Sequence, residues 1–326
     1  MRWVTIQNEP NTTQLTLPEY EDLNRALDAQ LIARGLRNQV GIMAGDLVES
    51  GQGGGQRLWL QYIAAHMNDI VDAYSEHVYW NYWDTERMEF RLKDIHKLVT
   101  EELPEEARKP TYITEFGVRG IQNFPGRPVV QPGYWEDGTP MGRTNIAAFQ
   151  QLWFDVLSAQ LGFDGTAKWD GYWGKYDSGT QAHWLIGPAE EGWPLFPAYH
   201  ALRLVLQTTQ RGWQVLGVDP WAEDDWNRDM QDTSEHEVAA YAGSNAELTL
   251  IGMDTAGGAL NAASPEMPAY SIGGLPAYTR FNLAIWNAGA NGENAIDGSV
   301  MTNGAGVARF EVPLHAAFAL TTVPVS

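Results

Sequence analysis

Two glutamates stand where the sequence leaves an apolar, strand-forming run. Glu9 follows the β-branched run at residues 3–6 and precedes Pro10, which cannot continue a strand ladder. Glu115 lies in the run TYITEF at residues 111–116. Barrel enzymes and doubly wound sheets place their chemistry at such carboxyl ends of strands. Each glutamate alone is equally typical of an ion pair, but together they indicate the carboxylate pair that cleaves a glycosidic bond.

The residues around these glutamates alternate between strand and helix patterns. Five strands are expected, at residues 3–6, 39–46, 75–80, 111–116 and 166–169. Helices are expected at residues 18–34, from the glycine loop to about residue 73, and at 85–102, 144–161 and 194–208. Strict alternation of strand and helix requires a parallel sheet with helices outside it. The carboxylates and aromatic residues follow the strands, so we expect them at one edge of that sheet.

The pattern changes at about residue 210. Helical periodicity ends, and short alternating strands are expected at residues 237–242, 247–252, 279–286, 308–313 and 317–323. In the run RFNLAIW, the side chains of Phe281, Leu283 and Ile285 are expected to point to one side. The sequence therefore predicts an α/β domain at residues 1–209 and an antiparallel β-sandwich at residues 210–326.

Composition excludes several classes of partner. The formal net charge is −20, so nucleic acids and anionic membranes would be repelled. The chain contains no cysteine, which excludes disulfides and thiolate metal sites. No apolar run approaches the roughly 20 residues of a membrane span. No His, Asp and Glu cluster has metal-ligand spacing, and we expect neither a metal nor another cofactor.

The chain is rich in aromatic residues, with 14 Trp and 13 Tyr. Several tryptophans, among them Trp83 and Trp173, fall in loops expected to follow strands. A loop tryptophan is commonly a lid over a core, but a group of them facing one cleft suits sugar rings, which stack on indoles.

Four motifs in order give residues 1–208 a resemblance to clan A glycoside hydrolases, which are (β/α)8 barrels such as glycoside hydrolase family 5. Asn8-Glu9-Pro10 is similar to the Asn-Glu pair that ends the fourth barrel strand. His77-Val-Tyr79 resembles the His-x-Tyr of the sixth strand. Glu115 stands where the seventh strand carries its glutamate, and Trp169 stands where the eighth strand carries a tryptophan.

The resemblance implies a role for each matched residue. Glu115 would be the nucleophile and Glu9 the general acid/base of a retaining mechanism. Tyr79 would hydrogen-bond Glu115, Asn8 would meet the sugar 2-hydroxyl, and His77 would join the polar network. Trp169 would form the floor of the subsite that binds the reacting sugar. Other candidates follow strand ends and are expected to line the cleft: Asp46, Asn81, Trp83 and Trp173.

The resemblance covers only part of a barrel. It accounts for strands four to eight, so the expected fold is a partial (β/α)8 TIM barrel followed by the β-sandwich. An open sheet leaves two edges and an apolar interior uncovered. The missing strands could be lost upstream sequence, could come from another polypeptide, or could be replaced by self-association, and we expect a homo-oligomer formed through the open barrel edges. Either a secreted or a cytoplasmic bacterial location fits, because a signal peptide would precede the missing strands.

Three functional hypotheses follow. The first is a retaining β-glycoside hydrolase, whole or truncated, that acts on β-linked glucan, mannan, xylan or a smaller β-glycoside. The second is a carbohydrate-binding remnant that keeps the aromatic cleft without turnover. The third is a doubly wound α/β protein in which Glu9 and Glu115 are ordinary ion-pair residues.

Overall fold

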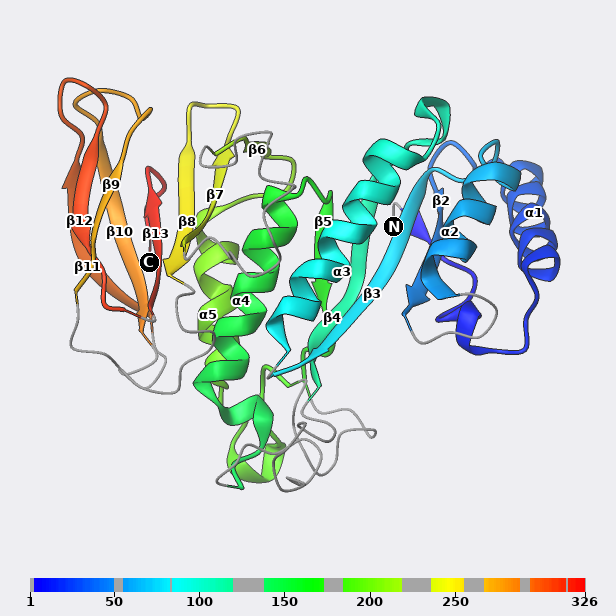
Figure 1. Ribbon diagram of the computed structural model, residues 1–326, viewed down its shortest axis with the longest axis horizontal. Coiled ribbons are helices and arrows are strands. Elements are labelled where there is room, and N and C mark those ends of the chain that lie inside the picture. Colours follow the sequence, from blue (N-terminus) through cyan, green and yellow to red (C-terminus); the bar gives the residue numbers. More distant parts are fainter. Residues whose placement is uncertain are drawn as a thin grey trace. The chain divides into compact units, whose positions relative to one another are not determined.

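The protein is described by a computed structural model (Figure 1). The structure describes residues 3–49, 55–82, 84–119, 138–172, 184–218, 236–254, 267–287, 294–314 and 316–325. These residues form two compact units. The first comprises residues 1–79, 87–117 and 161–169, and the second comprises residues 80–86, 118–160 and 170–326. The domain boundary expected at residue 210 lies inside the second unit and stays a prediction.

A five-stranded parallel sheet forms the frame of the first unit. Its strands are β1 (Trp3–Val4), β2 (Gly41–Val48), β3 (Ala73–Asn81), β4 (Thr111–Arg119) and β5 (Gly165–Lys168). They lie side by side in chain order, β1-β2-β3-β4-β5. A doubly wound sheet would reverse its strand order at a switch point, whereas a barrel does not. The expected partial barrel is therefore confirmed, and the doubly wound hypothesis is wrong.

The connecting helices begin and end largely where the sequence predicts. They are α1 (Leu17–Ala33), α2 (Gly55–His66) and α3 (Thr85–Lys97), the last continued by a π-helical turn at Leu98–Glu102. Thr16 caps α1 in a reciprocal capping box with Glu19. The second helix is shorter than predicted, because Asn68 and Asp69 are poor helix formers and the chain turns at Met67 before β3 begins. The apolar residues of that segment, Met67, Ile70 and Val71, are nevertheless buried.

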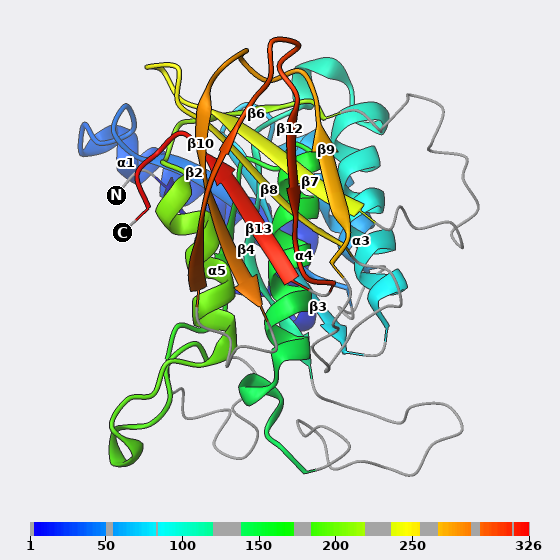
Figure 2. The same cartoon turned by 90° about the vertical axis from the view of Figure 1, so that its left-hand side faces the viewer.

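Helices α4 (Asn145–Gln160) and α5 (Pro197–Thr208) belong to the second unit together with the antiparallel sheets. A six-stranded sheet has the order β11-β10-β13-β8-β7-β6, and β12 pairs with β9 in a separate two-stranded sheet. The strand bounds are β6 (Gln214–Leu216), β7 (His236–Ala242), β8 (Leu248–Asp254), β9 (Ala269–Ile272), β10 (Arg280–Asn287), β11 (Asn294–Met301), β12 (Ala308–Glu311) and β13 (Ala316–Thr321). Figure 2 shows β10 and β13 in front of α4 and α5, which contact this sheet.

Alternation along β10 explains how the six-stranded sheet is covered on both faces. Phe281, Leu283 and Ile285 join one apolar cluster with Phe310 of β12, on the side of the two-stranded sheet. Trp286 is fully buried and lies 6.5 Å, ring centre to ring centre, from Phe149 of α4. The sequence predicted the first set. It missed β6, β9 and β11, which are short or interrupted by polar residues.

Within the described part of the chain, no helix has the length and apolar character needed to cross a membrane.

Candidate active site

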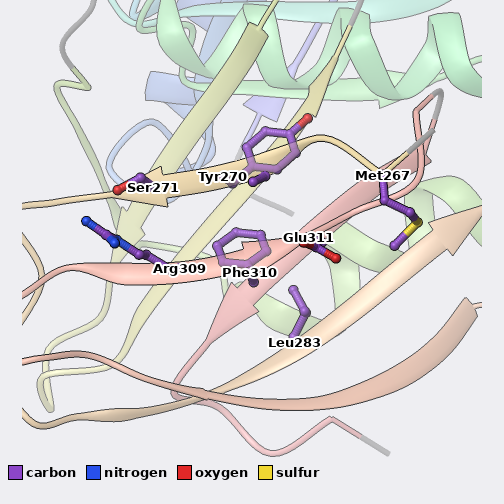
Figure 3. Close-up of a pocket in the computed structure, with 8 residues that line it drawn as sticks. Met267, Tyr270, Ser271, Leu283, Arg309, Phe310 and Glu311 are labelled. Atoms are coloured by element: carbon purple, nitrogen blue, oxygen red, sulfur yellow. The ribbon is translucent and has the colours of Figure 1, made fainter.

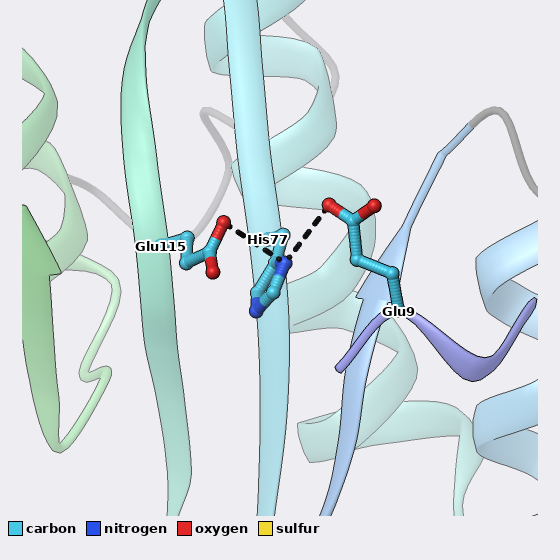
Figure 4. Close-up of side chains that lie close together, drawn as sticks. All are labelled: Glu9, His77 and Glu115. Carbon is cyan, nitrogen blue, oxygen red and sulfur yellow. Dashed lines mark hydrogen bonds and ion pairs between the residues drawn. The ribbon is translucent and has the colours of Figure 1, made fainter. Parts of the chain in front are cut away.

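Three side chains of the first unit, two on strands and one in the segment after β1, converge at one end of the sheet (Figure 4). Glu9 follows β1, His77 lies on β3, and Glu115 lies on β4. Figure 4 shows the imidazole of His77 between the two carboxylates. One oxygen of Glu9, one oxygen of Glu115 and a ring nitrogen of His77 all lie within 4.8 Å of one another. Parallel strands in chain order bring these distant positions to the same sheet edge.

The backbone of Glu9 is held in an uncommon conformation. Its φ is 45° and its ψ is 53°, in the left-handed region that residues other than glycine seldom adopt. The turn η1 (Pro10–Thr12) follows at once, and the amide of Thr12 donates to the carbonyl of Glu9 at 3.0 Å. Asn11 is almost fully buried, and its side chain donates to the carbonyl of Val48 at 2.6 Å and accepts from the amide of Val48 at 3.2 Å. This clamp fixes the segment that carries Glu9 to β2.

His77 is the centre of the charge arrangement. Its side chain is 1% exposed, and its Nδ1 lies 3.2 Å from Oε1 of Glu9 and 3.4 Å from Oε2 of Glu115. Its Nε2 lies 3.6 Å from Oδ1 of Asp46. Burial disfavours the charged imidazole, but hydrogen bonds to Asp46 and Glu9 and the charge of Glu115 together raise the pKa of His77 to about 9. The ring is therefore a cation at neutral pH.

An irregularity in β2 turns Asp46 toward this cation. The pairing of β2 with β3 shifts register between Gly45 and Leu47, and Gly45 and Asp46 both have positive φ angles. Thr114 donates to Oδ1 of Asp46 at 2.7 Å, and the amide of Asp46 donates to Oγ of Ser75 at 2.8 Å. Burial opposes ionisation of Asp46, yet hydrogen bonds from His77, Thr114 and Ser75 lower its pKa.

A second irregularity lies in β4 beside Glu115. The pairing of β4 with β5 shifts between Ile113 and Phe116. In a regular strand Thr114 and Glu115 would point to opposite faces, but here both reach the site. Tyr79 donates its hydroxyl hydrogen to Oε2 of Glu115 at 2.7 Å. Burial raises the pKa of Glu115, while the bond from Tyr79 and the charge of His77 counteract that rise.

The remaining described residues that the sequence predicted lie beside Glu9 or at the ends of strands. Asn8 is exposed beside Glu9, and Asn81 is the partly buried last residue of β3. Trp169 follows β5 with 43% of its surface exposed, and its amide donates to the carbonyl of Phe116 at 3.3 Å. This bond ties Trp169 to the residue after Glu115. Trp83 and Trp173 lie outside the described residues.

Sequence reasoning missed four supporting residues. Thr5 and Thr114 hydrogen-bond Asp46, Ser75 accepts from its amide, and Asn11 anchors the turn after Glu9. Asn11 stands directly after the Asn-Glu-Pro motif, and Thr114 stands directly before Glu115. For Asn11 and Thr114, this position beside the catalytic candidates was the sequence signal that could have identified them. Their roles depend on strand irregularities that a two-residue periodicity does not reveal.

A pocket of the second unit offers no comparable chemistry (Figure 3). It encloses about 720 Å³ beside β9 and β12. Tyr270, Phe310 and Leu283 line it, while Arg309 and Glu311 are its charged residues. Tyr270 and Phe310 stack on one another with ring centres 5.6 Å apart, so this pocket is the open margin of the apolar cluster between the sheets.

Comparisons by sequence find no relatives. No protein-family model matches the chain, and no curated protein matches it.

Comparison of structures finds solved proteins with a similar fold. The chain resembles a family 30 subfamily 8 xylanase from Clostridium acetobutylicum with a TM-score of 0.62 and 11% identity, covering 98% of this chain and 66% of that one. It resembles the catalytic domain of a family 30 xylanase from Talaromyces cellulolyticus with a TM-score of 0.64 and 10% identity, covering 99% and 63%. An α-L-arabinofuranosidase from Thermotoga maritima gives a TM-score of 0.62 and 12% identity, covering 98% and 65%.

These likenesses concern the fold. The chain spans 63–66% of the length of these three structures. The shared part is a partial barrel with the antiparallel β region that follows it. The sequence resemblance to clan A therefore agrees with the fold found by structural comparison.

Proposed function

Starting from the shared fold of clan A glycoside hydrolases, we propose that this chain is a retaining glycoside hydrolase. Glu115 is its nucleophile and Glu9 is its general acid/base. The observation that carries the proposal is the meeting of Glu9 and Glu115 at one sheet edge, with oxygens within 4.8 Å. Retaining enzymes hold their two carboxyl groups about 5–5.5 Å apart, whereas inverting enzymes need about 6.5–9.5 Å to admit a water.

In the first step Glu115 attacks the anomeric carbon of the sugar. The bond to the leaving oxygen breaks as Glu9 delivers a proton to that oxygen, and a glycosyl ester of Glu115 forms. In the second step Glu9 takes a proton from water, the water oxygen attacks the anomeric carbon, and the Glu115 carboxylate leaves. Tyr79 holds the attacking oxygen of Glu115 in place through its 2.7 Å hydrogen bond.

Substrate choice rests on residues beyond the carboxylate pair. Trp169 offers an exposed indole face on which a sugar ring can stack. The similar structures carry the names xylanase and α-L-arabinofuranosidase. A screen should therefore include aryl β-xylosides and α-L-arabinofuranosides beside β-glucosides and β-mannosides.

The test compares the wild type with Glu115→Gln and Glu9→Gln on the substrate that turns over best. We expect Glu115→Gln to lower kcat by at least about 1000-fold, because no nucleophile remains. We expect Glu9→Gln to lower the rate most for poor leaving groups, which need the proton, and least for activated aryl groups. Glu21→Gln is the matched control, since Glu21 also accepts a tyrosine hydroxyl, that of Tyr62, outside the site. Equal rates for wild type and Glu115→Gln would contradict the proposal.

A non-catalytic sugar-binding protein is the second candidate. The exposed indole of Trp169, on which a sugar ring can stack without any chemical step, supports it. In that case no substrate turns over, and xylo- or gluco-oligosaccharides quench tryptophan fluorescence in the wild type. The quenching should weaken in Trp169→Ala.

A further inference from the structure

The cluster of Glu9, His77 and Glu115 has the dimensions of a metal site. Zinc binds imidazole nitrogen at about 2.0–2.1 Å and carboxylate oxygen at about 2.0–2.2 Å, so tetrahedral ligand atoms lie about 3.3–3.5 Å apart. Nδ1 of His77 lies 3.2 Å from Oε1 of Glu9 and 3.4 Å from Oε2 of Glu115. The widest separation in the cluster stays within 4.8 Å. The side chain of Glu9 is 27% exposed, so its carboxylate can rotate inward and shorten the widest separation.

The surroundings of His77 are those of a metal-binding histidine. Such a histidine usually presents its far nitrogen to a carboxylate, which fixes the ring orientation and increases its strength as a ligand. Asp46 occupies that place at 3.6 Å from Nε2, and Thr114 fixes Asp46. The ring itself is 1% exposed, so it cannot turn away from the glutamates into solvent. Tyr79 fixes the orientation of the Glu115 carboxylate by donating a hydrogen bond to its Oε2.

We propose that Glu9, His77 and Glu115 bind a divalent transition metal ion such as Zn²⁺, with water at the fourth position. The ion takes the place of a proton on Nδ1, and that proton passes to solvent. One imidazole and two carboxylates suit zinc, whereas Mg²⁺ prefers an octahedral set of oxygens and several waters. The negative charge of Asp46 further favours a dication.

Metal binding has a consequence for the proposed function, and this part of the inference rests on that function. A bound ion occupies the oxygens that Glu115 needs for attack and Glu9 needs for proton transfer. Zn²⁺ is therefore an inhibitor that competes with the glycoside, and its removal by a chelator restores turnover.

The first test is calorimetric titration of the full chain, freed of metal with a chelator, with ZnCl₂. We expect one equivalent to bind to the wild type, and binding to Glu9→Gln and Glu115→Gln to be at least about 100-fold weaker, because each loses an anionic ligand. Asp46→Asn should weaken binding by about 10–100-fold, as expected for a residue that supports a ligand. MgCl₂ should give no binding under the same conditions.

A second histidine of the chain provides the control. His66 is exposed, stacks on Tyr62 and lies at the end of α2, so His66→Ala should leave zinc binding unchanged. Trp169→Ala should also retain zinc binding, because the indole is not a ligand. Circular dichroism and thermal melts of each variant separate loss of the site from loss of the fold. Because the Glu9 side chain is the most exposed of the three, Glu9→Gln is the substitution that should disturb the fold least.

The outcomes of the two proposals are distinguishable. Zinc binding that Glu9→Gln and Glu115→Gln leave intact, or that His66→Ala removes, overturns the metal site whatever the activity. Zinc binding lost in both glutamate variants supports the site even if no glycoside is cleaved. Turnover that depends on Glu115 but is insensitive to saturating Zn²⁺ overturns the inhibition.

Discussion

The position of His77 decides how three carboxylates can share one small region. Glu9, Asp46 and Glu115 all lie within 3.6 Å of an imidazole nitrogen, so the imidazolium offsets the repulsion between those of them that are ionised. The neighbouring carboxylates of Asp46, Glu9 and Glu115 favour the charged ring against the cost of its burial. A charge that is fixed in a partly buried site costs no reorganisation during the reaction. His77 is therefore the organising residue of the candidate site, although it neither attacks nor protonates the sugar.

The hydroxyl of Tyr79 should matter for turnover and little for substrate binding. Tyr79→Phe removes the hydrogen bond that fixes Oε2 of Glu115 but keeps the ring. We expect kcat to fall roughly 10–100-fold with KM nearly unchanged, because the misplaced nucleophile affects the transition state. Steady-state kinetics on the best aryl glycoside measure the effect. Tyr62→Phe removes an equivalent bond to Glu21 elsewhere, and a loss of similar size there would contradict the interpretation.

The turn after β1 is the element that holds Glu9, and its anchor is Asn11. Asn11→Ala leaves the buried amide and carbonyl of Val48 without their partner. We expect a loss of about 2–4 kcal/mol in unfolding free energy, since each buried unsatisfied group costs about 1–3 kcal/mol. Urea denaturation checks this value, and activity should fall further than stability explains, because Glu9 loses its support.

An exposed asparagine supplies the comparison for this variant. Asn245 bonds Glu247 at the surface, so Asn245→Ala should cost well under about 1 kcal/mol. Equal losses for the two variants would show that Asn11 is not a clamp.

The irregularity in β2 depends on helix α1 through Tyr20. The amide of Gly45 donates to the Tyr20 hydroxyl at 3.0 Å, and Tyr20 is fully buried. Burial raises the pKa of Tyr20 to about 12 from an ordinary value of 10.0. Because the folded pKa is the higher one, this contribution to stability is complete below about pH 10 and is lost as pH rises toward 12, roughly 3 kcal/mol in all.

The variant Tyr20→Phe tests this link between α1 and β2. At neutral pH it should be less stable by about 1–2 kcal/mol, because the Gly45 amide loses its acceptor. Between about pH 10 and 12 the wild type should lose this advantage, since only the wild type must ionise Tyr20 on unfolding. Urea denaturation at pH 7, 10 and 11.5 measures both differences. A constant difference across this range would contradict the assignment.

The alternation of strand and helix patterns predicted the parallel strands and their helices well, because buried parallel strands are short apolar runs with clear ends. The positions of Glu9, His77, Tyr79 and Glu115 followed from those ends and from the motifs. Asp46 was expected to line the cleft, but its place behind His77 and the contribution of Thr114 did not follow, because both reach the site through register shifts at Gly45 and Ile113. Such shifts depend on backbone angles and on neighbours from other strands, which local sequence patterns do not encode.

At the scale of the whole molecule, the incomplete barrel is the dominant feature. The sheet of the first unit has five strands, and β1 and β5 stand at the two ends of its order. A closed barrel of this class has eight strands. Strand edges attract further strands, and natural proteins normally protect them. Association through β1 and β5 would pair the backbone groups at these edges.

We therefore propose that the chain self-associates, and that its net charge makes this association depend on salt concentration. A net charge of −20 opposes contact between copies, and salt screens that repulsion, with a Debye length of about 8 Å at 0.15 M and about 3 Å at 1 M. Sedimentation velocity in the micromolar range should show an average mass that rises with protein concentration and with NaCl concentration. Val4→Lys, which adds a charge to the edge strand β1, should reduce association, whereas Leu206→Lys on the exposed face of α5 should not. Light scattering that gives a monodisperse monomer at both salt concentrations would refute the proposal, and an equal effect of the two lysine variants would place the interface elsewhere.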